Sequence, residues 1–404
     1  MRKLNMAKIK VIGLLCILTL LLSGCWSKRE LNELAIVVAL GIDKIDDAYE
    51  VTVQIVDPSE VSMKQASTQR SPVISYHARG ETIFEAIRKM TTLAARKPYF
   101  AHLQVVVLGE ELAKEGISES LDLISRDHEF RKDFDVIMSY EAAAKDVLNV
   151  LTPIEKVPAN KMLNSLEVSE KAWGSTIAIN IDELVNTLSS KDKGALISAI
   201  EIHGDKKLGV DQANVQRVKT PVLLQYAGLA VFKKDKFIGL LTEEESKSVS
   251  FLSDKIKSTI EIIACPKKGT LSTEITHSKT KVKGSFQHGE PAIDVQIEVE
   301  QNVGEVECDI DLSKPKSIDY VNQKTAQGIK GRIEEALEKI QQQYEVDVLG
   351  FGDTLHRADA KQWKKIKNDW PTIFPELPIH VHVKVKTQGL GTMQNSLLNK
   401  PKEE

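Results

Sequence analysis

The feature that most constrains this chain is its N-terminus, where a short apolar run follows a basic start. Arg2, Lys3, Lys8 and Lys10 precede an unbroken apolar run over residues 11–22. As a helix this run is about 18 Å long, whereas the hydrocarbon core of a bilayer is about 30 Å thick and needs about 20 residues to cross. The pattern therefore indicates a secretion signal and not a permanent membrane span.

The signal ends in Leu22-Ser23-Gly24-Cys25, which resembles the lipobox of bacterial lipoproteins. The resemblance implies that the Cys25 thiol receives a diacylglyceryl group and that cleavage between Gly24 and Cys25 makes Cys25 the lipidated N-terminus. Each buried CH₂ stabilises attachment by about 0.8 kcal/mol, so two acyl chains hold a folded chain durably on a membrane. The alternative is a plain signal peptide in which Cys25 has no role.

Composition restricts what the rest of the chain can be. Its 404 residues include 54 Lys and Arg against 57 Asp and Glu, and 42% are hydrophobic, which describes a folded chain of two or three domains. Without the four basic residues of the signal the formal charge is −7, so we expect no binding to nucleic acid. No later segment has 18 consecutive apolar residues, and we expect everything after Cys25 to lie in water outside the membrane.

Two cysteines, Cys265 and Cys308, remain after the signal and the lipidation site. Residues 306–312 alternate between apolar and polar, which places Cys308 on an apolar face of a strand. We expect Cys308 to be a small buried hydrophobic side chain. A disulfide with Cys265 is the alternative that an exported protein leaves open.

Short strand-like runs and helical patterns alternate along the mature chain, which predicts an α+β fold of mixed α/β character. Residues 25–150 are predicted to form an N-terminal mixed α/β domain, and a Pro-punctuated stretch at 152–158 indicates its boundary. We predict a middle α+β domain over 151–245, a C-terminal α+β domain over 246–390 and a tail over 391–404.

The expected strands are residues 35–42, 49–56, 73–78, 103–108, 134–140, 195–203, 223–232, 237–241, 293–300 and 379–386. The expected helices are residues 81–96, 116–127, 142–151, 160–173, 179–188 and 322–344, one that begins after the N-cap Thr242, and one that carries Trp363 and Trp370.

The sequence has no G-x-G-x-x-G, Walker loop, H-E-x-x-H, G-x-S-x-G or paired C-x-x-C motif. His380 and His382 lie two apart on a predicted strand and face the same way, as a metal site would require. Lys384 and Lys386 continue that face and would repel a cation, so we expect no metal site. We also expect no catalytic residues and no cofactor.

Three other groups admit a functional and a structural interpretation. Residues 347–353 with His356 place two glycines near carboxylates, as in a general acid or phosphate site, but a strand entering a tight turn explains Gly350 and Gly352 by positive φ. Residues 243–245 are three glutamates, predicted to be a solvated helix start instead of a cation site. The Trp363 and Trp370 pair is expected to pack in a core.

Several stretches spread over the mature chain form a recognisable set. They are GCWSKRELNELA at 24–35, GID at 41–43, RKPYFAH at 96–102, GLAVF at 228–232 and DVLGFGDTLH at 347–356, followed by Trp363, Trp370, Phe374 and Pro375. Together they resemble the C-subunit lipoproteins of spore germinant receptors, the Ger(x)C family. The departure is Ser27, where the family more often has Asp.

The resemblance implies a non-enzymatic receptor subunit of spore-forming bacteria. It would be held by lipid on Cys25 at the outer face of the spore inner membrane. It would work with two integral membrane partners, the A and B subunits, in the response to nutrient germinants. The implied fold is three mixed sheet-and-helix domains in an elongated arrangement.

A different function remains open, that of an exported ligand-binding lipoprotein that captures a small nutrient between its domains. The sequence does not decide whether the chain binds a small molecule directly. An enzyme acting on cell wall or lipid is a third class, but it needs positioned acids or a nucleophile, and we find no such set.

Overall fold

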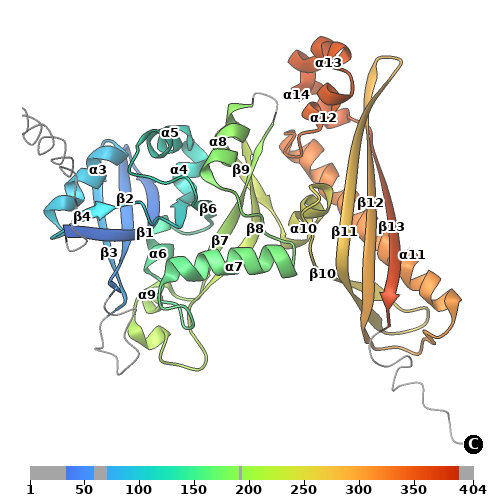
Figure 1. Cartoon of the computed structure of the whole chain (residues 1–404), viewed down its shortest axis with the longest axis horizontal. Helices are drawn as coiled ribbons and strands as arrows, with labels where there is room; N and C mark the ends of the chain where they lie inside the picture. The colour runs from blue at the N-terminus through green and yellow to red at the C-terminus, as the bar shows by residue number, and fades with distance from the viewer. Residues whose placement is uncertain (1–32, 59–70, 191–192, 391–404) are drawn as a thin grey trace, which may run out of the picture.

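The computed structural model describes residues 33–58, 71–190 and 193–390, so the signal and Cys25 lie outside the described residues. Two sheets, each covered by helices, lie side by side with α10 (Glu243–Leu252) between them (Figure 1). The predicted α+β class is confirmed.

The first sheet has nine strands in the spatial order β3-β2-β1-β5-β6-β7-β8-β9, with β4 paired to β1. Pairing is parallel from β1 through β5 and β6 to β7 and antiparallel toward both edges. The strands are β1 (Leu34–Ile45), β2 (Ala48–Val56), β3 (Val73–Gly80), β4 (Lys97–Tyr99), β5 (Val105–Leu108), β6 (Asp135–Ser139), β7 (Ala195–His203), β8 (Leu223–Lys233) and β9 (Lys236–Leu241).

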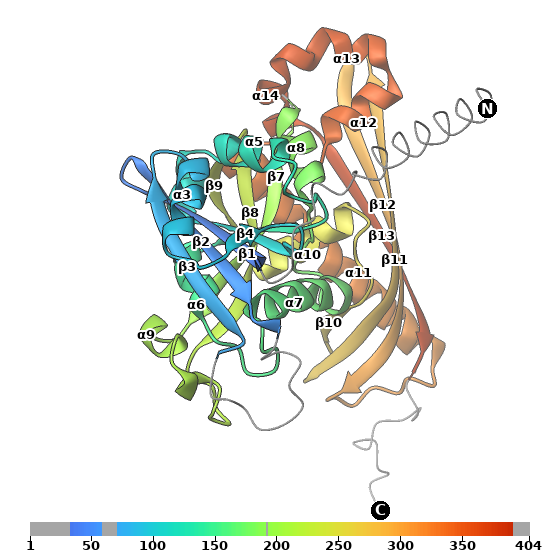
Figure 2. The ribbon, with the colours of Figure 1, turned by 60° about the vertical axis from the view of Figure 1, so that its left-hand side comes forward.

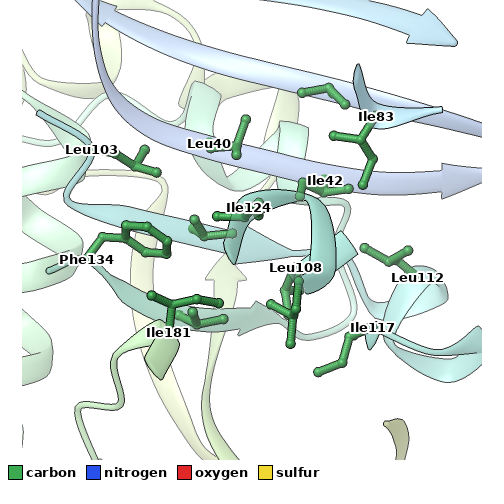
Figure 3. Packing of buried hydrophobic residues seen from close by; sticks show 14 of the residues in the cluster. Leu40, Ile42, Ile83, Leu103, Leu108, Leu112, Ile117, Ile124, Phe134 and Ile181 are labelled. Atoms are coloured by element: carbon green, nitrogen blue, oxygen red, sulfur yellow. The ribbon is translucent and has the colours of Figure 1, made fainter. Parts of the chain in front are cut away.

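Helices cover both faces of this sheet, because alternate residues of its central strands enter two separate cores. Val106 and Leu108 of β5 belong to the core under α3, α4, α5 and α8, part of which Figure 3 shows. Val105 and Val107 belong to the core under α6 and α7. The helices are α3 (Ile83–Lys89), α4 (Glu110–Glu115), α5 (Ser118–Arg126), α6 (Ala144–Asn149), α7 (Pro158–Ala172), α8 (Ile181–Ser189) and the short α9 (Lys206–Gly209). All four β5 residues are buried, as a strand covered on both faces requires.

The second sheet has the order β10-β11-β12-β13, antiparallel except for the parallel pair β12–β13. Its strands are β10 (Thr259–Ala264), β11 (Thr270–Gln287), β12 (Glu290–Val306) and β13 (Ile379–Gly389). Ile293, Val295, Ile297 and Val299 of β12 are buried, as the sequence alternation predicts.

The long helix α11 (Pro315–Glu338) packs on this sheet and continues into a π-helical turn (Lys339–Tyr344). Its predicted apolar stripe, which includes Ile329 and Ile333, is buried. Three short helices, α12 (Phe351–Ala358), α13 (Ala360–Ile366) and α14 (Trp370–Ile373), gather at one end of the sheet (Figure 2).

The first sheet contains strands from both sides of the domain boundary expected near residue 150. Met138 and Ser139 at the end of β6 pair with Ala199 and Ile200 of β7, so residues before and after 150 share the first sheet. The division into three domains stays a prediction. The helix expected over 81–96 is shorter, since α3 is followed by a 3₁₀ turn (Met90–Thr92).

The expectation that Cys308 is a free buried side chain is wrong, because Cys265 and Cys308 form a disulfide with a Cα–Cα distance of 6.4 Å. Cys308 is indeed buried, but β12 ends at Val306 and the chain then passes beside the β10–β11 turn. There the Glu307 amide donates a hydrogen bond of 2.9 Å to the Thr270 carbonyl. The alternation of apolar and polar residues along 306–312 indicates that Cys308 is buried, but it does not reveal that Cys265 lies beside it.

Candidate functional site: the Asp347 loop and the helix α10 junction

The Asp347 side chain organises the loop that carries part of the family resemblance. Its Oδ1 accepts hydrogen bonds from the amides of Leu349 (3.2 Å), Gly350 (2.8 Å) and Phe351 (3.0 Å), and its Oδ2 accepts one from the Gly352 amide (2.8 Å). These amides lead into α12, so the carboxylate caps that helix and complements its dipole. Asp347 therefore fixes the loop, and both of its carboxylate oxygens are engaged in doing so.

Opposing effects act on the Asp347 carboxyl, which is only 3% exposed. Burial raises its pKa, while the amides of Gly352, Phe351 and Gly350 and the nearby Lys193 charge act in the lowering direction. Removing the carboxyl would leave four amide donors without their acceptor in a buried loop.

Glycine is required at positions 350 and 352 for two different reasons. Gly350 has φ +73°, which confirms the prediction of a left-handed position. Gly352 lies inside α12 without positive φ, so its prediction is wrong. A Cβ at Gly352 would lie 2.8 Å from Trp363 Cη2 and 3.1 Å from Trp370 Nε1, so this glycine permits close packing. The strand expected before the turn is also absent, since residues 345–350 form a loop.

Trp363 and Trp370 pack in the core, as predicted. Their rings meet edge to face with centroids 5.1 Å apart, and Phe374 lies 5.8 Å from Trp370. All three side chains are buried. Trp370 Nε1 has no hydrogen-bond partner among the residues that the structure describes.

The candidate metal pair lies on an exposed strand face. His380 and His382 of β13 stand opposite Asp294 and Gln296 of β12, and Lys384 stands opposite Glu298. Within the described ranges, no three His, Cys, Asp or Glu side chains gather in a way that could hold a metal ion.

The three glutamates that begin α10 do more than face solvent. Thr242 and Glu245 form a capping box, and Glu245 also contacts Lys339 Nζ at 2.7 Å. Glu244 contacts Lys247 Nζ at 3.0 Å and Arg332 Nε at 3.4 Å. The predicted cap is confirmed and Glu244 is exposed, but Glu244 and Glu245 also form ion pairs that connect α10 to the C-terminal part of α11 and the turn after it.

Helix α10 bonds to both sheets. The Leu229 amide of β8 donates to Ser246 Oγ at 3.0 Å, and Thr280 Oγ1 of β11 donates to the Phe251 carbonyl at 2.6 Å. Val249, Phe251 and neighbouring residues join the core of the second sheet. Because these groups are buried, α10 fixes the two sheets relative to each other.

Sequence reasoning missed Asp43, a buried residue of β1 in the GID stretch. Its oxygens accept from the amides of Ala144 (2.7 Å) and Lys145 (3.0 Å), so it caps α6 from 101 residues away. A Cβ at Gly109 would lie 2.1 Å from Asp43 Oδ1, which explains that glycine. A cap supplied by a distant strand leaves no local sequence signal.

Asp135, at the start of β6, gives a testable pH dependence. Burial raises its pKa from 3.8 to about 6, and the charges of Glu167, Glu170 and Glu183 add to the rise. The folded state therefore holds the Asp135 proton more tightly than the unfolded chain does. The stability that the protonated carboxyl contributes is lost as the pH rises from about 4 to about 6.

Asp135→Asn removes this ionisation cost. We expect the variant to melt at a higher temperature than the wild type at pH 7.5 and at the same temperature near pH 3.5. Thermal unfolding at both pH values tests this, with Asp319→Asn on the exposed surface of α11 as the control that changes nothing at either pH. Equal melting temperatures of Asp135→Asn and wild type at pH 7.5 would contradict the expectation.

In the part of the chain that the structure describes, no helix combines the length and hydropathy of a membrane crossing.

Two family models match, and together they span most of the chain. The model described as spore germination protein N-terminal domain matches residues 27–202, and that described as spore germination B3/GerAC like, C-terminal matches residues 227–391. The first match covers most of the first sheet. The second begins within β8 and includes the second sheet.

Similar proteins come from Bacillus subtilis (strain 168). Spore germination protein KC is 34% identical over 97% of this chain and 98% of its own length. Spore germination protein B3 is 23% identical over 93% of this chain and 96% of its own length, and spore germination protein A3 is 26% identical over 94% and 98%.

A solved structure, the crystal structure of the GerBC protein, has the same fold with a TM-score of 0.56. It is 19% identical and covers 86% of this chain and 96% of its own. Matched along both family regions and over nearly the whole length of its relatives, this chain belongs to the spore germination B3/GerAC-like family.

Proposed function

We propose that this protein is the lipid-anchored, non-enzymatic C subunit of a spore germinant receptor. It works with integral membrane A and B subunits in the response to nutrient germinants. The observation that carries the proposal is full-length similarity, 34% identity over 97% of the chain, to spore germination protein KC. The lipobox that ends in Cys25 supports the anchor and a place on the outer face of the spore inner membrane.

The fold supports a scaffolding role. Helix α10 is hydrogen-bonded to β8 and to β11, so a partner bound to one sheet is held at a defined position relative to the other. A lipid tether raises the effective concentration of the chain beside membrane partners, so weak interfaces suffice. The acids that could suggest a catalytic or cation site have structural roles, since Asp347 caps α12 and Glu245 caps α10.

The anchor is tested by Cys25→Ala in spores. We expect the variant to leave the membrane fraction and the response to nutrients to fall sharply, because the acyl chains supply the attachment. Fractionation with an antibody and the loss of optical density after nutrient addition measure the two effects. Cys16→Ala is the matched control, because it removes a cysteine from the signal without touching the lipobox. Normal germination with the Cys25→Ala protein released from the membrane would contradict the proposal.

A further inference from the structure

A pocket of about 570 Å³ lies where the first sheet meets the Asp347 loop and α14. One side comes from the end of α8 with Lys193 and from Lys233 and Lys234 at the β8–β9 turn. The other side comes from residues 345–347, Trp370 and Phe374. The volume falls within the range of about 300–1,000 Å³ typical of small-molecule sites.

The two sides of the pocket are joined at its edge. The Gly194 amide, next to Lys193, donates a hydrogen bond of 3.0 Å to the Asp347 carbonyl. A Cβ at Gly194 would lie 2.6 Å from Val346 Cγ2, so the two segments pack with no room for a side chain. Gly194, next to Lys193, is thus held against residues 346–347 without a ligand, which lowers the entropy cost of binding on this side.

The pocket lining has three lysines, Lys193, Lys233 and Lys234, against two acids, Glu345 and Asp347, so positive charge is in excess. Lys233 Nζ lies 3.8 Å from Glu345 Oε2 and 3.5 Å from the Tyr344 carbonyl, and the Lys193 charge acts on the Asp347 carboxyl. Within the described residues neither Lys193 nor Lys234 forms an ion pair. The Asp347 carboxylate does not neutralise them by direct contact, because its oxygens are bonded to four amides.

Most of the remaining lining is apolar. Besides Ser189 and Ser190, it comes from Leu188 of α8 and from Val346, Trp370, Pro371 and Phe374. Trp370 and Phe374 are each only 1% exposed, so each contributes little exposed surface to this wall. Apolar walls exclude water and strengthen the attraction between a lysine and an anion.

We propose that this pocket binds a small organic carboxylate that carries an apolar group. Lys193 and Lys234 hold the carboxylate, and the apolar group packs against Trp370 and Phe374. Because the walls come from the first sheet and from the helices of the second, a bound carboxylate contacts both sides of the junction that α10 already holds together. This inference goes beyond the proposed function and does not depend on the lipid anchor or on the membrane partners.

The test uses full-length protein in detergent micelles, with 4-phenylbutyrate as the probe. Thermal shift and calorimetric titration compare it with 4-phenylbutan-1-ol, which lacks the charge, and with acetate, which lacks the apolar group. We expect saturable binding of 4-phenylbutyrate and at least about tenfold weaker binding of the two others, since each lacks half of the interaction.

The lysine variants locate the site. Lys193→Ala/Lys234→Ala should weaken 4-phenylbutyrate binding about tenfold or more, and Lys193→Arg/Lys234→Arg should retain it. The control Lys219→Ala changes an exposed lysine outside the pocket lining and should bind as the wild type does. The inference is overturned if the alanine pair binds as tightly as the wild type. It is equally overturned if no saturable binding occurs up to about 10 mM, where even a millimolar ligand saturates.

Discussion

Replacing Asp347 by alanine is expected to lower the free energy of unfolding by about 4 kcal/mol. The carboxylate accepts four backbone hydrogen bonds at 2.8–3.2 Å, and the three from Gly350, Phe351 and Gly352 are buried. Alanine leaves those amides without an acceptor, and each unsatisfied buried group costs about 1–3 kcal/mol. Chemical denaturation of the full-length variant, followed by circular dichroism, measures the loss.

Two further variants separate the cap from general effects of charge. Asp347→Asn keeps one oxygen acceptor and should lose about half as much stability as Asp347→Ala. Asp353→Ala removes an exposed acid from the first turn of the same helix and should change stability by no more than about 0.5 kcal/mol. Equal losses for Asp347→Ala and Asp353→Ala would show that the buried hydrogen bonds are not responsible.

Removing the disulfide with Cys265→Ala/Cys308→Ala is expected to cost about 4 kcal/mol. The bond joins residues 43 apart in sequence, and closing a loop of this length restricts the unfolded chain considerably. It also ties the ends of β10 and β12 at one end of the second sheet. Denaturation with and without dithiothreitol measures the effect.

The reductant provides the control for this prediction. The reduced wild type should unfold at the same denaturant concentration as the double variant, and dithiothreitol should leave the double variant unchanged. A wild type that is insensitive to dithiothreitol, together with free Cys265 and Cys308 in peptide mapping, would contradict the bond.

Local signals in the sequence predict local structure well in this chain. The strand predicted at residues 195–203 has the bounds of β7, and the Thr242 N-cap and the buried odd positions of β12 are as expected. Each of these features depends on residues within one element, so hydrophobic period and capping chemistry are sufficient.

The features that the sequence did not predict correctly depend on contacts between distant segments. Gly352 is small because two tryptophans of later helices pack over it, and its own backbone gives no sign of this. Cys308 pairs with a residue on another strand, and Asp43 caps a helix far along the chain. The pocket beside Asp347 likewise joins segments from residue 188 to residue 374, which no local pattern could bring together.

The proposal that this protein is a lipid-anchored receptor subunit is tested most directly by purifying it from spore inner membranes through a C-terminal tag. The mass of its N-terminal peptide and the identity of the co-purifying proteins are then determined together. The account predicts a peptide that begins at a diacylated Cys25 and two multi-span membrane partners. An unmodified Cys25 with no membrane partner would contradict it.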